Sequence, residues 1–262
     1  MDLGLKGKRA VVTAASRGLG RAAASALAAE GADIAICSRS QAIFDAAQQI
    51  QADVEGKVLA YQADMTKAES IDDFVSKADK DMGGIDIVII NAGGPPPGGF
   101  LDLTLDDWQA AIDLTLLSAI RLCYAVIPKL LNHGDGSIVA TESYSIKQPI
   151  DNLILSNTLR LGVIGLMKSL ANELGPKGIR VNSINPAWTW TERVAQLMSD
   201  RAERNGTSIE EQTQRISVEV PLGRMGTVEE FGKTIAWLAS PAASFIHGHA
   251  LMFDGGAVKT PL

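Results

Sequence analysis

The chain has 262 residues, of which 46% are hydrophobic and 21% are charged, and this composition excludes a disordered or fibrous protein. Its 24 Lys and Arg residues against 30 Asp and Glu residues give a formal net charge of −6. Because binding to a phosphate backbone needs clustered basic residues, we expect no nucleic-acid partner, although a local basic pocket for a small anion is compatible with this charge.

The cysteines and the N-terminus indicate the compartment. Cys37 and Cys123 stand alone, and His247 and His249 have no third ligand at a metal-binding spacing, so we expect neither a disulfide framework nor a metal site. Residues 1–9 lack the apolar stretch of a signal peptide, and we expect no apolar run near the ~20 residues that a membrane span needs. These features favour a cytoplasmic protein with no membrane partner.

Short apolar, β-branched runs alternate with longer helical patterns along the whole chain, which is typical of a parallel sheet with crossover helices. Several runs are apolar throughout, as strands buried on both faces require. The sequence therefore predicts one doubly wound, seven-stranded α/β sheet, with strands at residues 9–14, 32–37, 57–61, 85–91, 136–142, 179–185 and 249–254.

The helical patterns lie between these strands, at residues 17–30, 40–53, 67–82, 106–131, 152–175 and 228–240. No linker, repeat or change in composition divides the chain, so we expect a single domain over residues 1–262. The segment 188–221 is too long for a simple turn, and we expect it to form a mobile substrate lid that carries short helices.

A glycine-rich turn follows the first predicted strand. It consists of Thr13, Ala14, Ala15, Ser16, Arg17, Gly18, Leu19 and Gly20, and an Ala-rich helix comes next. Glycines there allow the backbone to approach a pyrophosphate, and the N–H groups at the helix N-terminus attract its negative charge. An ordinary tight turn is the alternative, but the position after strand one favours a dinucleotide-binding site.

The end of the second predicted strand indicates which dinucleotide binds. An acidic residue that would accept hydrogen bonds from a ribose 2′-hydroxyl is replaced there by Arg39, 19 residues after Gly20. Arg39 could bind a 2′-phosphate together with Arg17, which favours NADP over NAD. The alternative is that both arginines are solvated surface charges.

Further motifs occur along the chain. They are Ala63-Asp64, Asn91-Ala92-Gly93-Gly94, Gly136-Ser137-Ile138-Val139 leading to Ser143, the run from Lys177 to Asn182 with Asn185-Pro186, and the terminal Phe253-Asp254-Gly255-Gly256. With the glycine-rich turn they resemble the short-chain dehydrogenase/reductase family, and particularly its 3-oxoacyl-carrier-protein-reductase-like members, over essentially the full length.

The resemblance implies a Rossmann-type domain with helices on both faces of the sheet, and it implies the cofactor contacts. These are Thr13, Ser16, Arg17, Gly18, Leu19, Gly20, Arg39, Asp64, Asn91, Ala92, Gly93, Arg160, Pro186 and Thr191. It also implies a homotetramer or homodimer that pairs the helices at 106–131 and 152–175.

The catalytic motif of that family is degenerate in this sequence. Thirteen residues after Ser143, where the family has Tyr, stands Ser156, and four residues further, where it has Lys, stands Arg160. In addition, Ala14 replaces the first glycine of the turn, Thr115 replaces a helix-four Asn, and Ala187 replaces a Gly.

These changes remove the usual proton donor. A serine hydroxyl is a far weaker acid than a phenol, and a guanidinium is effectively never deprotonated. Ser143 remains as a hydrogen-bond donor to substrate. Tyr144, with Glu142 beside it, is the nearest phenol in sequence and a candidate replacement acid, although a packed aromatic is the alternative. A general acid typically contributes ~10²–10⁴-fold, so its loss need not abolish turnover.

The sequence thus predicts an NADP(H)-dependent oxidoreductase that acts on a small-molecule carbonyl or alcohol, of 3-oxoacyl or other ketone type, with an atypical proton donor. One alternative is a catalytically weak dinucleotide-binding pseudoenzyme or regulatory protein. A less favoured one is a non-redox lyase, because halohydrin dehalogenases of this superfamily carry Arg at the Lys position but keep the Tyr.

Overall fold

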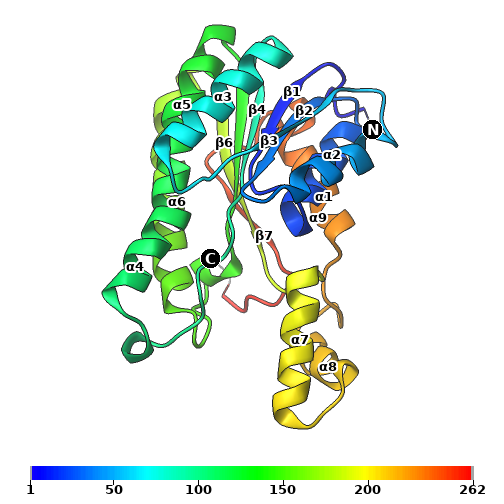
Figure 1. Cartoon of the computed structure of the whole chain (residues 1–262), viewed down its shortest axis with the longest axis vertical. Coiled ribbons are helices and arrows are strands. Elements are labelled where there is room, and N and C mark those ends of the chain that lie inside the picture. The colour runs from blue at the N-terminus through cyan, green and yellow to red at the C-terminus, as the bar shows by residue number, and fades with distance from the viewer. Residues whose placement is uncertain (1, 261–262) are drawn as a thin grey trace.

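A computed structural model describes residues 2–260, in which seven parallel strands form one sheet in the order β3-β2-β1-β4-β5-β6-β7 (Figure 1). Each strand lies within two residues of its expected bounds, so the predicted doubly wound Rossmann-like sheet is confirmed. The strands are β1 (Arg9–Val12), β2 (Asp33–Ser38), β3 (Val58–Gln62), β4 (Ile87–Ile90), β5 (Gly136–Thr141), β6 (Ile179–Pro186) and β7 (Ala250–Phe253).

Helices cover both faces of this sheet, as Figure 1 shows. On one face α3 (Ala68–Met82), α5 (Ser118–His133) and α6 (Ile154–Leu174) form a core with residues such as Phe74 and Val163. On the other face α1 (Gly18–Ala29), α2 (Ala42–Gln51) and α9 (Val228–Ala239) bury Leu27 and Phe231. The central strands are therefore apolar on both faces, which explains their uninterrupted hydrophobic runs.

The helix expected at 106–131 differs from its prediction in one respect. It consists of α4 (Leu105–Ala111), a π-helical segment Ile112–Leu117 and α5. Thr115 lies in the π-helical segment, where its buried Oγ1 has no hydrogen-bond partner among the described residues. Such π segments are frequent at functional sites, and simple 3.6-residue periodicity does not reveal them.

This same helix corrects the expectation that no run approaches membrane-spanning length. Leu105–His133 is 29 residues long and is apolar enough to cross a bilayer by length and composition alone. However, Leu122, Val126 and Leu130 are buried in the core shared with α3 and the sheet. We therefore interpret it as a sheet-covering helix, since burial in a protein core selects the same apolar composition as a membrane.

The lid segment carries two helices, α7 (Glu192–Asn205) and α8 (Ile209–Glu219), which project below the sheet in Figure 1. The side chains of Thr191 and Ser208 cap them by accepting hydrogen bonds from backbone N–H groups of the first turn. Met198 of α7 and Ile216 of α8 are buried in one small apolar cluster, together with Met225. The lid helices were thus correctly expected, while the mobility of the lid stays a prediction.

Arg180, from the run Lys177 to Asn182, and His247 have structural roles in the fold. From β6, Arg180 donates hydrogen bonds to the carbonyls of Leu238, Ala239 and Ser240 at the C-terminus of α9. The His247 ring contacts the Ala171 carbonyl through Nε2 at 2.8 Å and accepts from the Val181 N–H through Nδ1 at 3.1 Å. His247 therefore joins α6 to β6.

Candidate active site

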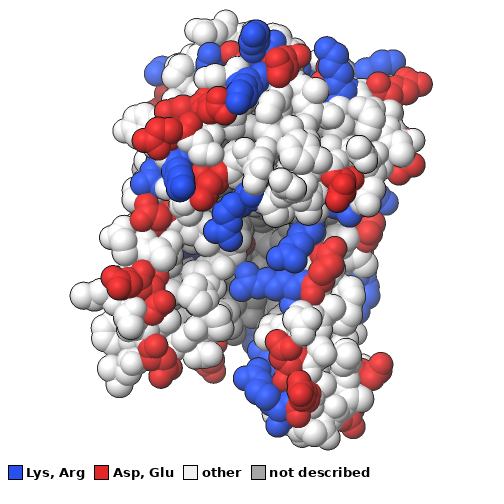
Figure 2. All heavy atoms as spheres, viewed as in Figure 1, with Lys and Arg blue, Asp and Glu red and all other residues white. Residues whose placement is uncertain are grey.

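A cleft of about 380 Å³ opens at the carboxyl ends of the central strands. It lies where the strand order reverses between β1 and β4, which is the place where open α/β sheets bind ligands. Figure 2 shows the hollow above the lobe formed by α7 and α8, with Lys and Arg side chains around it. The lining residues are Ala14, Ser16–Leu19, Asn91–Gly94, Thr141, Glu142, Arg160, Ala187, Thr189 and Thr191–Val194.

The glycine-rich turn is held by close packing against β4. A Cβ atom at Gly20 would lie 2.5 Å from the Ala14 carbonyl oxygen and 2.6 Å from Asn91 Nδ2, so only glycine fits. Ala14 itself has φ +49°, in the left-handed region that favours glycine. This explains why a glycine is common at that position in the family and shows that this chain tolerates the strain.

Thr13 and Asn91 fix the turn in place. The Asn91 backbone N–H donates to Thr13 Oγ1 at 2.9 Å, and that hydroxyl donates to the Asn91 carbonyl at 2.7 Å. Asn91 Nδ2 donates in turn to the Ala14 carbonyl at 3.2 Å. Thr13 and Gly20 are buried behind the turn and shape it, whereas Ser16, Arg17, Gly18 and Leu19 face the cleft.

The start of α1 fits the diphosphate of a dinucleotide. Arg17 occupies the N-cap position with extended backbone, and in the described part of the chain its side chain makes no capping hydrogen bond. The first-turn N–H groups and the Arg17 guanidinium are therefore available to an anion. The donor set matches the chemistry of a pyrophosphate.

Arg39 and Asp64 lie together beyond the ends of β2 and β3. Burial alone would raise the pKa of Asp64, but hydrogen bonds from Thr66 and the charges of Arg39 and Lys67 hold it below its ordinary value. The Arg39 side chain is exposed, and its backbone carbonyl accepts a hydrogen bond from Gln62 Nε2 at 2.9 Å. This places an exposed cation and a carboxylate at the predicted adenosine end.

The degenerate motif forms a buried ion pair. Arg160 Nη1 donates to Glu142 Oε2 at 3.0 Å and Arg160 Nε donates to Ser156 Oγ at 3.0 Å. The side chains of Glu142 and Arg160 are 5% and 11% exposed, and both residues line the cleft. Burial raises the pKa of Glu142 to about 7, although the Arg160 charge opposes the shift.

Ser143 and Tyr144 lie beyond that pair, at the start of a short 3₁₀ turn. Ser143 Oγ accepts a hydrogen bond from the Ser145 N–H at 3.1 Å. Burial and the nearby Glu219 raise the pKa of Tyr144, while Trp188 and Arg201 of the lid oppose the shift. Tyr144 therefore faces the lid with a phenol that holds its proton tightly, and its role as replacement acid stays a prediction.

Sequence reasoning missed Arg193 and named Glu142 only as a neighbour. Arg193 Nη1 would lie 2.6 Å from a Cβ atom at Gly94, so this lid side chain extends over the Asn91–Gly94 loop. Desolvation and the charges of Arg160 and Arg17 lower the pKa of Arg193. The opposite charges of Glu142 and Arg160 in the sequence could have indicated their ion pair. The position of Arg193 depends on how the lid packs, so no sequence signal indicated it.

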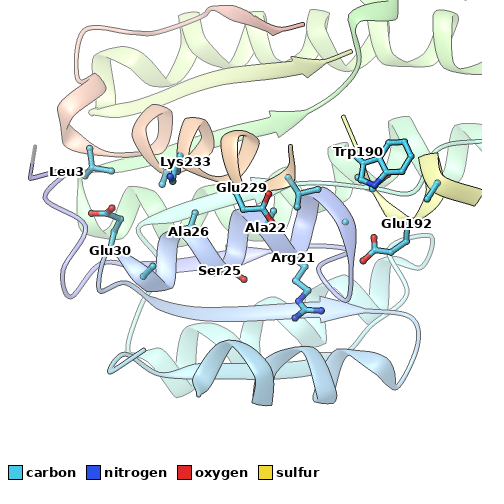
Figure 3. Close-up of a pocket in the computed structure, with 16 residues that line it drawn as sticks. Leu3, Arg21, Ala22, Ser25, Ala26, Glu30, Trp190, Glu192, Glu229 and Lys233 are labelled. Atoms are coloured by element: carbon cyan, nitrogen blue, oxygen red, sulfur yellow. The ribbon is translucent and has the colours of Figure 1, made fainter. Parts of the chain in front are cut away.

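Thr191 and Ala187, the residue after Pro186, line the cleft from the side of β6. Pro186 ends β6, and Thr191 lines the cleft while its Oγ1 accepts from the Val194 N–H at 3.2 Å. A second cavity, of about 730 Å³, lies between α1, α9 and the start of α7 and shares Gly18 and Thr191 with the cleft (Figure 3). None of the predicted catalytic groups lines this second cavity. Arg160 lines the smaller cleft, whereas Ser143, Tyr144 and Ser156 are not among its lining residues, so we place the chemistry in the smaller cleft on the position of Arg160.

The fold and cleft are those of a dinucleotide-binding class of α/β protein, and comparisons with known proteins agree. A family model described as enoyl-(acyl carrier protein) reductase matches residues 13–258. L-rhamnose 1-dehydrogenase (NAD(P)(+)) of Sphingomonas sp. is 34% identical, over 96% of each chain. The 3-oxoacyl-[acyl-carrier-protein] reductase of Synechocystis sp. is 32% identical, over 95% of this chain and 96% of that protein.

A solved structure is similar over nearly the whole chain. L-sorbose reductase from Gluconobacter frateurii, complexed with NADPH and L-sorbose, superposes with a TM-score of 0.96 at 30% identity and covers 99% of this chain and 100% of its own. The protein therefore belongs to the short-chain dehydrogenase/reductase family, and these relatives are oxidoreductases.

Proposed function

We propose that this protein is an NADP(H)-dependent oxidoreductase that transfers hydride to or from a small-molecule carbonyl or alcohol, with an atypical proton donor. The observation that supports the proposal is the start of α1, where Arg17 makes no capping hydrogen bond among the described residues, together with the exposed Arg39 side chain beyond β2. The NADPH complex of the similar L-sorbose reductase supports NADP over NAD.

Each part of the cleft has a place in this function. Residues 16–19 would hold the diphosphate, and Arg17 and Arg39 would hold the 2′-phosphate. Asp64 would contact the adenosine, while Asn91–Gly93, Arg160, Pro186 and Thr191 would border the ribose and nicotinamide. When bound, the reduced nicotinamide supplies a hydride. Ser143 would donate a hydrogen bond to the substrate oxygen.

The substrate class is a ketone or alcohol that fits under the lid. Relatives are named for sugars, L-rhamnose and L-sorbose, and for 3-oxoacyl thioesters. Trp188, with the Arg201 guanidinium 5.5 Å from its ring centroid, provides a flat surface near Tyr144. A panel of ketoses, short ketones and 3-oxoacyl thioesters therefore covers the proposed range.

Calorimetric titration with NADPH and NADH, followed by the carbonyl panel, tests the proposal. NADPH is expected to bind more tightly than NADH, and at least one carbonyl is expected to be reduced. Binding without turnover across the panel would favour the pseudoenzyme alternative, and no binding of either coenzyme at millimolar concentration would remove the redox assignment. The retained phosphate-binding turn disfavours the lyase alternative.

We further propose a cytoplasmic homotetramer or homodimer assembled through α5 and α6. Tyr124 on α5 is 80% exposed and Leu161 on α6 is 51% exposed, so these helices present large apolar side chains to the surface. Burying such side chains against a second copy would remove apolar area from water.

A further inference from the structure

Glu142 occupies a distinctive place in the cleft. It follows β5 directly, its side chain is almost fully buried, and it lines the cleft together with Arg160 and Asn91. It is the residue immediately before Ser143, the proposed hydrogen-bond donor to the substrate, and the cleft that it lines is also lined by Arg193 and Thr191 of the lid. A buried carboxyl group therefore lies in the wall of the cleft whose other residues are proposed to border the nicotinamide.

The hydrogen bonds around Arg160 leave part of this carboxyl free. Arg160 uses Nη1 for Glu142 Oε2 and for the Thr141 carbonyl, and uses Nε for Ser156 Oγ. Among the described residues, the Glu142 carboxyl makes its side-chain hydrogen bond and ion pair through Oε2, which leaves Oε1 for the cleft. Arg160 thus orients the carboxyl group and holds Ser156.

A buried ion pair has little value for stability alone. Desolvation of both charges offsets most of their attraction, and well-packed apolar residues at such positions are often as stable or more so. The Glu142–Arg160 pair lies at the cleft wall, and Arg160 and Ser156 are the two positions at which this chain departs from the family's Lys and Tyr. The pair therefore points to a role in the chemistry.

Resting on the proposed function, we propose that Glu142 is the proton donor and acceptor of this site, and that Arg160 and Ser156 are positioning residues. In reduction, the Glu142 O–H bond breaks and its proton bonds to the carbonyl oxygen. The carbonyl carbon receives a hydride from the reduced nicotinamide, so its C=O π pair becomes the pair of the new O–H bond. The products are the alcohol, the Glu142 carboxylate and the oxidised nicotinamide, and oxidation runs the same steps in reverse.

The groups that face Glu142 favour this exchange. Burial makes the protonated form accessible near neutral pH, where the pKa of Glu142 is about 7. Arg160 of α6 stabilises the carboxylate that forms, and Arg17, Arg193 and Glu192 are the other charged residues that line the cleft. A general acid with a pKa near the working pH is the most effective one.

The competing groups are less suited. Ser156 Oγ accepts from Arg160 and is an aliphatic hydroxyl, and a guanidinium does not give up its proton. The Tyr144 phenol lies against Trp188 and Glu219, where burial raises its pKa. Glu142 is the acidic residue that both lines the cleft and forms an ion pair with Arg160 of the degenerate motif.

The experiment compares Glu142→Gln, Glu142→Ala and a matched control, Asp86→Asn. Asp86 forms another carboxylate–guanidinium pair, with Arg9, at 2.7 Å between Oδ1 and Nη2 and at the opposite end of the sheet, where the side chains are 14% and 20% exposed. Both pairs lose one carboxylate, so the control reports the effect of a broken ion pair on folding. NADPH affinity, carbonyl reduction against pH, and the infrared carboxyl band of the coenzyme-free protein are measured for each.

We expect wild-type reduction to fall as pH rises through neutrality, because the acid form is lost. Glu142→Gln is expected to bind NADPH like wild type, to lose about 10²–10⁴-fold in reduction rate, and to lose this pH dependence. Formate should restore part of the rate of Glu142→Ala, since the truncation leaves room for a small carboxylic acid. The infrared band of a carboxylic acid that titrates near neutral pH should be present in wild type and in Asp86→Asn but absent from Glu142→Gln.

The outcomes separate the two proposals. The proposed function is wrong if the wild-type protein neither binds NADPH nor reduces any carbonyl. In that case the infrared band still shows whether Glu142 holds a proton near neutral pH. An active Glu142→Gln with an unchanged pH profile overturns the assignment of Glu142. The assignment also fails if formate gives no rescue while Asp86→Asn is equally slow, or if the carboxyl band is missing from wild type.

Discussion

The side-chain amide nitrogen of Asn91 lies 3.2 Å from the carbonyl oxygen of Ala14, and this hydrogen bond joins the glycine-rich turn to the end of β4. The same nitrogen would lie 2.6 Å from a Cβ atom at Gly20. The turn therefore has no room for a side chain at position 20.

Gly20→Ala is expected to force this turn apart. The added methyl would meet the Ala14 carbonyl, which is backbone and cannot rotate away, so we expect a loss of about 1–3 kcal/mol in the free energy of unfolding. NADPH affinity should fall with it. Urea unfolding and calorimetry measure both. Gly165→Ala, in α6 where the new Cβ atom meets nothing within 4 Å, is the comparison and should not lower stability. Equal stability of the two variants would contradict the packing argument.

Arg39→Asp is expected to change coenzyme preference. It removes a cation from the proposed 2′-phosphate site and adds a carboxylate beside Asp64, so NADPH affinity should fall about 10–100-fold, while NADH binding should weaken less. Titration with both coenzymes measures the ratio. Arg204→Ala, on the exposed end of α7, should leave the ratio unchanged. A preference that survives Arg39→Asp would place the 2′-phosphate elsewhere.

Arg180→Met is expected to destabilise the fold. The guanidinium donates to the carbonyls of Leu238, Ala239, Ser240, Ala243 and Ile246, and methionine offers them no donor. Leaving such buried acceptors unpaired should cost about 2–5 kcal/mol in the free energy of unfolding. Arg180→Lys keeps the charge at the C-terminus of α9 but not the fork, so its loss should be smaller. A neutral Arg180→Met would show that water replaces these bonds.

The stability of the coenzyme-free protein should depend on Glu142 through pH. Because burial raises its pKa from 4.5 to about 7, the folded state binds the proton more tightly than the unfolded chain between these values. The Glu142 contribution to the free energy of unfolding is therefore greatest at acid pH and falls as pH rises through this window, by at most about 1.4 kcal/mol per pH unit. The corresponding decline should be smaller in Glu142→Gln. Urea unfolding of both proteins at pH 5, 6, 7 and 8 gives the difference, and parallel curves would contradict the burial argument.

Tyr124→Glu is expected to break the proposed assembly. Tyr124 is 80% exposed on α5, so a charge there should leave the fold intact but disfavour burial against a second copy. Light scattering should then give a smaller mass than for wild type. Val218→Glu, which changes another exposed apolar residue but on the lid helix α8, should leave the mass unchanged. A wild-type protein that is monomeric at micromolar concentration would remove the proposed interface.

The sequence by itself determined the elements and their order, because the periodicity of a strand or a helix depends on only a few neighbouring residues. The alternation of apolar runs and amphipathic segments predicted β1 to β7 to within two residues, and the glycine-rich turn that the sequence singled out lines the cleft through Gly18. The π-helical segment that contains Thr115 escaped this reasoning, because it is a local change of register inside a continuous helix.

Only the tertiary structure decided which side chains share the cleft. Glu142 and Arg160 are 18 residues apart, and their ion pair exists because α6 packs beside the end of β5. The placement of Arg193 over Gly94 depends on how the lid returns to the sheet, and Tyr144 faces Trp188 for the same reason. Such contacts follow from the packing of distant elements, whose energy no local stretch of sequence contains.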